Sequence, residues 1–165
     1  MESRPGIKPV FSSFDKALEL TGIVLLAILW GLSIYAYAKL PDIIPTHFNA
    51  TGEADALGGK TTLLILSIVA TVLYAGLTAL GGFPHIFNYV RPITEANAQR
   101  QYSIATRLLR VLKVVIVFIF SLIILFVYLT TIGIMHGPGF WFLPLTASLV
   151  FIPVIVSIVQ SLKKQ

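Results

Sequence analysis

One long uncharged stretch constrains this chain more than any other feature. Residues 114–162 contain no Asp, Glu, Lys or Arg. A membrane-spanning helix needs about 20 apolar residues, so this stretch is too long for a single crossing. The turn-forming cluster His136-Gly137-Pro138-Gly139 divides it. We therefore predict two spans, over residues 111–135 and 140–162.

Two further apolar runs precede this stretch, at residues 20–38 and 61–82. In the whole chain 56% of the residues are hydrophobic and 12% are charged, whereas a soluble domain carries roughly 25% charged residues. Backbone groups in lipid must form their hydrogen bonds within the chain, so each run should be a helix. The predicted fold is an all-α membrane protein with four transmembrane helices in a single integral membrane domain, residues 1–165.

The basic residues are distributed unevenly among the segments that flank these spans. Ten of the twelve Lys and Arg residues lie near the two termini or in residues 83–113, and Lys39 and Lys60 lie in the loop 39–60. Basic residues favour the cytoplasmic side, which places both termini and the loop 83–110 inside the cell. This topology accounts for the net charge of +5, and we expect no nucleic-acid binding.

The first apolar run also allows a different interpretation. Lys16, the run itself and Ala36-Tyr37-Ala38 resemble a cleavable signal peptide with a small-residue cleavage site. The run is longer than the usual apolar core of about 7–15 residues. Tyr35 and Tyr37 also suit the interface of a retained span, and we expect it to be retained.

The predicted outside loop is the most polar part of the chain. Between Leu40 and Asp55 it reads Leu-Pro-x-x-Ile-Pro-x-His-Phe-Asn-x-x-Gly-Glu-x-Asp, and it closes with Gly58-Gly59-Lys60. Residues 46–50 could form a short extended piece, and residues 51–55 resemble a turn. The loop pattern resembles the outside-loop signature of the SdpI-related bacterial membrane proteins. Some longer members of that family protect the producing cell against a secreted toxic peptide, so the resemblance implies a role in immunity or peptide sensing.

Seven residues of the outside loop are candidates for contact with a ligand. They are Pro45, His47, Asn49, Gly52, Glu53, Asp55 and Lys60. One imidazole, one amide and two carboxylates within this short segment could bind a cation. Their spacing matches no named metal motif, so we assign no metal ligand. Alternatively, these polar groups hydrogen-bond one another and form a compact cap over the helices.

The predicted inside segment contains a second group of candidates. No Pro or Gly follows Thr94 until Gly133, which predicts a third helix that begins in the cytoplasm, with Thr94 as its cap. The segment also resembles the loop of short SdpI-related proteins, in Phe87-Asn88-Tyr89 and residues 93–102. The candidates for contact with a cytoplasmic protein are Asn88, Thr94, Glu95, Asn97, Arg100 and Tyr102. The alternative is an amphipathic extension packed on the helices or on anionic headgroups, with Tyr102 and Leu109 covered by the chain's own N-terminal segment.

No set of nucleophile, base and orienting residues is visible, and no ionisable residue lies at mid-depth of a predicted span. We therefore expect no catalytic residue and no cofactor. The prediction is a non-enzymatic, multi-pass protein of the bacterial plasma membrane. Its partners would be the lipid bilayer, an external peptide or protein, and a cytoplasmic protein. Two alternatives are an oligomeric transporter or channel subunit, and a metal-dependent membrane enzyme with His47, Glu53 and Asp55 at its site.

Overall fold

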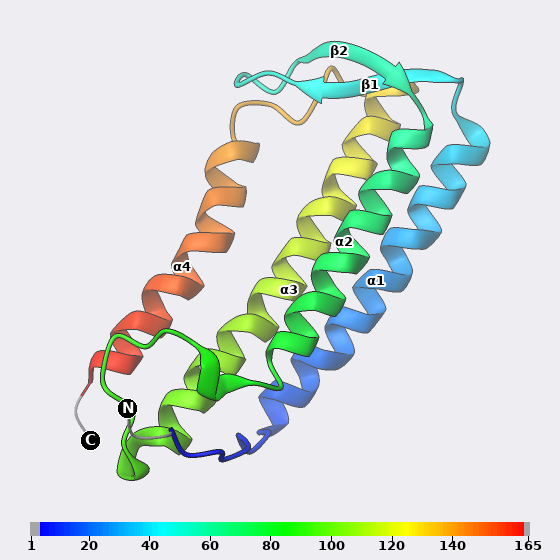
Figure 1. Cartoon of the computed structure of the whole chain (residues 1–165). Helices are drawn as coiled ribbons and strands as arrows, with labels where there is room; N and C mark the ends of the chain where they lie inside the picture. Colours follow the sequence, from blue (N-terminus) through cyan, green and yellow to red (C-terminus); the bar gives the residue numbers. More distant parts are fainter. Residues whose placement is uncertain (1–3, 164–165) are drawn as a thin grey trace.

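The computed structural model describes residues 4–163, which form four long helices, one hairpin and a short 3-10 helix (Figure 1). In chain order the elements are α1 (Ser13–Lys39), β1 (Ile43–Phe48), β2 (Ala54–Gly59), α2 (Thr61–Leu80), η1 (Pro84–Ile86), α3 (Glu95–Thr131) and α4 (Phe142–Leu162). All four long helices have the length and apolar character needed to cross a membrane. The four predicted helices are therefore confirmed, and their length and composition indicate a multi-pass membrane protein.

Helix α1 begins several residues before its apolar run because a capping box starts it there. The Ser12 N–H donates to Asp15 Oδ2 at 2.9 Å, and the Asp15 N–H donates to Ser12 Oγ at 3.2 Å. These two bonds satisfy N–H groups that have no partner inside the helix. The early start adds a polar turn to the helix and places Asp15 and Glu19 on one face.

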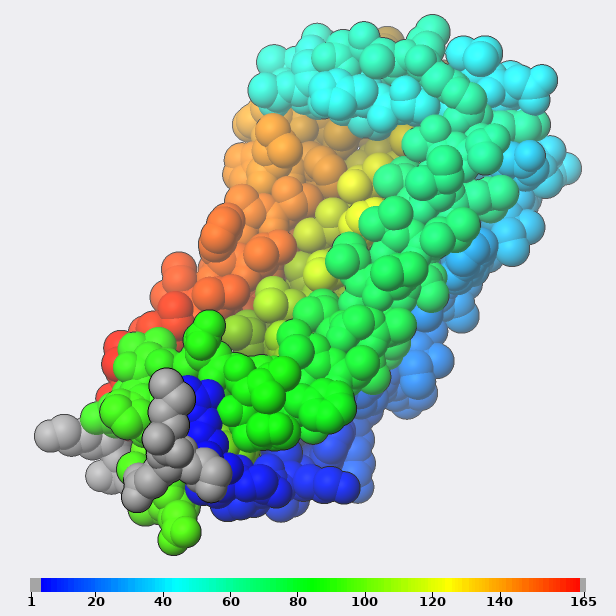
Figure 2. All heavy atoms as spheres, in the orientation of Figure 1, coloured from blue at the N-terminus to red at the C-terminus, as the bar shows by residue number. Residues whose placement is uncertain are grey.

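Helix α3 is the central element of the bundle, and α1, α2 and α4 all pack against it. It starts at Glu95 and continues to Thr131, which confirms the predicted long third helix with Thr94 as its N-cap. Helices α1 and α2 also pack on each other, whereas α4 packs mainly on α3. Figure 2 shows the result as a hollow between α2 and α4, with α3 as its floor. A core of apolar side chains fills the space between α1, α2 and α3, including Leu29, Ala36, Leu63, Ala70, Val117, Ile124 and Val127.

The fold is mostly helical rather than entirely helical, which corrects the all-α prediction. Strands β1 and β2 pair as an antiparallel hairpin, with Ile43 opposite Gly59 and Phe48 opposite Ala54. The register is irregular on both sides of His47, which disrupts the simple alternation that identifies a strand in a sequence. The hairpin lies across one end of the bundle, which we call the hairpin end (Figure 1). The described N- and C-terminal residues lie at the opposite end, the terminal end.

Candidate ligand-binding site

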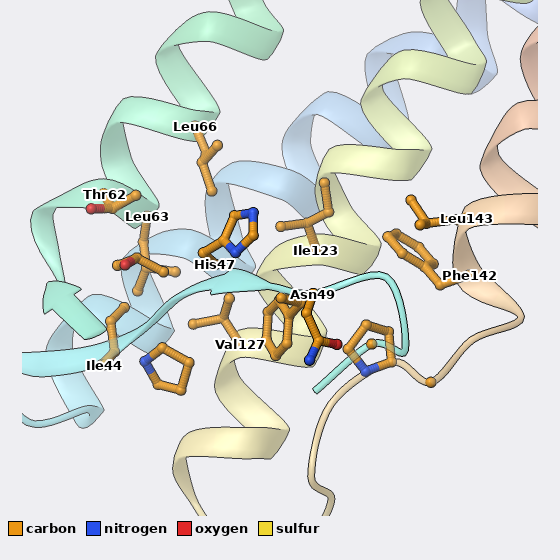
Figure 3. A pocket seen from close by; sticks show the side chains of 16 residues that line it. Ile44, His47, Asn49, Thr62, Leu63, Leu66, Ile123, Val127, Phe142 and Leu143 are labelled. Carbon is orange, nitrogen blue, oxygen red and sulfur yellow. The ribbon is translucent and has the colours of Figure 1, made fainter. Parts of the chain in front are cut away.

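A cavity of about 290 Å³ lies beneath the hairpin, between it and the ends of α2, α3 and α4 (Figure 3). Most of the side chains around it are apolar, and polar ones are few. The main apolar lining residues are Ile44, Pro45, Phe48, Leu63, Leu66, Ile123, Val127, Phe142 and Leu143. His47, Asn49 and Thr62 contribute polar groups. This combination suits an apolar group that carries a polar part at one end.

Strand β1 forms the roof of this cavity and also attaches the hairpin to the bundle. Ile44 is almost completely buried in the main core, and Phe48 packs against that core. Pro45 is buried as well, and it lacks an N–H group that would need a partner there. The predicted site residue Pro45 therefore lies at the cavity, beside the buried Ile44.

His47 and Asp55 are brought together across the hairpin. His47 Nδ1 lies 2.5 Å from Asp55 Oδ1, and their side chains are 67% and 42% exposed. His47 also lines the cavity, so one residue joins the apolar space to an exposed polar pair. A pair this exposed contributes little to folding.

Asn49 and Gly52 organise the turn that connects the two strands. Asn49 Oδ1 accepts hydrogen bonds from the Thr51 N–H, the Thr51 hydroxyl and the Glu53 N–H, at 2.6–3.0 Å. Gly52 has a φ of 81°, and a Cβ there would overlap the backbone of Gly139 in the loop before α4. These contacts dock the tip of the hairpin and close one side of the cavity.

Lys60 closes the other end of the hairpin. Its ammonium group lies 3.1 Å from Asp42 Oδ1 and donates to Leu40 O at 3.3 Å. The same group lies 5.1 Å from the centre of the Tyr37 ring. Glu53 is exposed and accepts a hydrogen bond from the Thr51 hydroxyl at 3.3 Å. Several candidate residues of this loop therefore also shape it, whereas His47 and Asp55 remain available at its surface.

The candidates predicted for a cytoplasmic contact lie at the terminal end and divide into buried and exposed residues. Tyr102 is fully buried, and its hydroxyl donates to Pro5 O at 3.0 Å. The chain's own N-terminal segment therefore covers Tyr102. Arg100 donates to Lys163 O and Gln160 O at 2.8 and 2.7 Å, so it caps the end of α4.

Asn97 belongs to the start of α3, where its side chain accepts from the Thr94 N–H and donates to Pro92 O. Asn88 and Glu95 are exposed. Tyr89 packs beside the buried Tyr102, with ring centres 5.7 Å apart, and burial raises the pKa of Tyr89. Its hydroxyl thus stays protonated and donates to Pro84 O at 2.8 Å.

Sequence reasoning did not identify a network of charges between α1 and α3. Asp15 and Glu19 of α1 face Arg107, Arg110 and Lys113 of α3. Asp15 is 3% exposed and Lys113 is 1% exposed, measured on the side chains. The signal in the sequence is two acidic residues four apart and three basic residues three apart, which places each set on one helix face.

Within residues 4–163, no group of three His, Asp or Glu side chains is arranged to hold a metal ion. His47 and Asp55 form a pair, and Glu53 hydrogen-bonds within the turn.

The comparisons with known proteins match the segment of the chain that contains the hairpin. The family model of a domain of unknown function (DUF1648) matches residues 24–71, which cover most of α1, the whole hairpin and half of α2. An uncharacterised protein of Archaeoglobus fulgidus is 40% identical over 57 residues. That match covers 34% of this chain and 31% of the archaeal protein, so the chain matches about a third of that relative. No solved structure matches this chain.

Proposed function

We propose that this protein is a non-enzymatic receptor of a prokaryotic plasma membrane, and that its cavity beneath the hairpin binds a hydrophobic peptide or envelope component. The proposal rests on the position of β1 over an apolar cavity of about 290 Å³. His47 lines this cavity and pairs with the exposed Asp55. An apolar side chain of a peptide would enter the cavity, while its backbone would meet the polar pair.

In the proposed orientation the hairpin end faces outward and both termini face the cytoplasm. The distribution of basic residues supports this orientation. The terminal end of the described chain contains most of them, whereas Lys39 and Lys60 lie next to the hairpin. Basic residues in short flanking segments favour the cytoplasmic side. This orientation exposes the cavity to molecules secreted into the surroundings of the cell.

The likeness of the outside loop to that of SdpI-related proteins supports a peptide as the ligand. Longer relatives of that kind protect their cell against a secreted toxic peptide. We accordingly propose peptide sensing or immunity as the biological role. The exposed Asn88 and Glu95 at the terminal end are the residues that a cytoplasmic partner would contact.

Two neighbouring substitutions on α2 test the proposal. Leu66 lines the cavity, whereas Ile65 is 52% exposed on the outside of the bundle. Leu66→Trp should fill the cavity, and Ile65→Trp makes a comparable change in size without entering it. The measurement is growth of a peptide-sensitive bacterium that expresses each variant, challenged with a secreted toxic peptide. Protection by the native chain and by I65W, but not by L66W, supports the proposal. Equal protection by both variants, or none by the native chain, would refute it.

A further inference from the structure

A second and larger cavity, of about 660 Å³, opens at the terminal end between α1, α2, α3 and the N-terminal segment. Four charged residues line it, namely Lys8, Glu19, Arg110 and Lys113. Its apolar lining includes Phe11, Leu77 and Leu109. Ionisable groups inside a membrane bundle are costly, and they pair with one another or mark a binding or conduction path.

The charges of this cavity do not balance. Three cations face it against the single carboxylate of Glu19. Glu19 is shared, because its Oε1 lies 3.3 Å from Arg110 Nε and its Oε2 lies 2.6 Å from Lys113 Nζ. The nearby Asp15 carboxylate is engaged by Arg107 at 2.9 and 3.0 Å, so it adds little free negative charge. The cavity therefore has an excess of positive charge.

Arg110 offers the group through which an anion would be held. Its Nε pairs with Glu19, and its Nη1 contacts Thr106 and Asp15. Among residues 4–163 the Nη2 atom of Arg110 forms no hydrogen bond, and it is not among the fully buried atoms that lack a partner. Phe11 covers the guanidinium from one side, with its ring centre 4.0 Å from Cζ. The planar group is thus fixed in orientation and retains a free donor.

We propose that this cavity binds a phosphate group, supplied by an anionic phospholipid of the adjacent leaflet or by a free phosphate anion. Arg110 Nη2 and the ammonium group of the exposed Lys8 would donate to the phosphate oxygens. The cavity lies beside the last turn of α2 and the first polar turns of α1, at the ends of these two helices, where lipid headgroups would lie. Phe11, Leu77 and Leu109 would contact the glycerol and upper acyl chain. Basic pockets between membrane helices bind such headgroups in other proteins.

The test uses the full chain, purified in detergent and stripped of lipid. Native mass spectrometry measures the retention of added phosphatidic acid against phosphatidylcholine. Arg110→Gln removes the proposed donor, and Lys8→Gln removes an exposed charge whose loss leaves the buried network intact. Lys16→Gln is the matched control, because Lys16 is exposed on α1 and does not line the cavity. Each lost charge-assisted bond should weaken phosphatidic acid binding about tenfold.

Preferential retention of phosphatidic acid by the native chain and by K16Q, with loss in R110Q and K8Q, supports the site. Addition of inorganic phosphate identifies the source. Release of the lipid assigns the site to a free anion, and its persistence assigns the site to a headgroup. No preference for phosphatidic acid in the native chain, or an equal loss in K16Q and K8Q, overturns the proposal.

Discussion

The carboxylate of Asp15 receives two hydrogen bonds from the guanidinium of Arg107, at 2.9 and 3.0 Å, across the contact between α1 and α3. Ser12 joins the same group, because its hydroxyl donates to Asp15 Oδ2 at 2.6 Å and accepts from Arg107 Nη2 at 3.2 Å. The residue that starts α1 is therefore also tied to α3.

Loss of this link should destabilise the protein. We expect Asp15→Asn to lower the free energy of unfolding by about 1–3 kcal/mol, because the substitution removes the buried carboxylate that pairs with Arg107 and Arg110. The expected loss is smaller than for a fully buried pair, because the Arg107 side chain is 39% exposed. Unfolding by SDS titration in mixed micelles measures the change. Glu95→Gln, an exposed charge at the start of α3, should change stability by less than about 0.5 kcal/mol. A D15N variant as stable as E95Q would contradict the role of the pair.

The docking of the hairpin tip depends on Gly52. We expect Gly52→Ala to release the tip, because the added Cβ overlaps Gly139 and the positive φ is unfavourable for alanine. Faster proteolysis within residues 49–53 is the measurement, compared with Gly59→Ala. Gly59 has open space around its Cβ position and no positive φ, so its substitution should leave proteolysis unchanged. Identical cleavage of both variants would contradict this role of Gly52.

The four spans could be predicted from the sequence because apolar length is a local property. The long helix α3 could be predicted equally well, because no Pro or Gly interrupts residues 95–132. The hairpin could not be predicted in this way, because Pro45 and the irregular register disrupt the alternation of apolar and polar residues along its strands. The buried side of β1 is also created by packing on the bundle, through Ile44 and Phe48, which no local pattern contains.

The candidate sites show the same limit. His47 and Asp55 stood out because polar residues are rare in this chain, and the structure brings them together. The network of Asp15 with Arg107 joins residues 92 apart in sequence. In the sequence alone, those charged residues are equally compatible with ordinary helix ends and with signals of membrane topology. Their pairing requires knowledge of how α1 packs on α3.

His47 and Asp55 should matter for ligand binding rather than for folding. We expect His47→Ala and Asp55→Ala to lower stability by less than about 1 kcal/mol, because exposed ion pairs contribute little. Both should abolish protection against a secreted toxic peptide in the growth assay. Leu57→Ala, at a site 71% exposed on the same hairpin, should retain protection. Full protection by H47A and D55A together would exclude this pair from the proposed site.

The orientation of the chain can be measured directly, because the chain contains no cysteine. A single Ala56→Cys places a thiol on the exposed surface of β2, and Asn88→Cys places one on the exposed segment between α2 and α3. In the proposed orientation, intact cells should allow a membrane-impermeant maleimide to label A56C. N88C should become labelled after the membrane is permeabilised. The reverse pattern would place the hairpin in the cytoplasm, and the cavity beneath it could then no longer receive a secreted peptide.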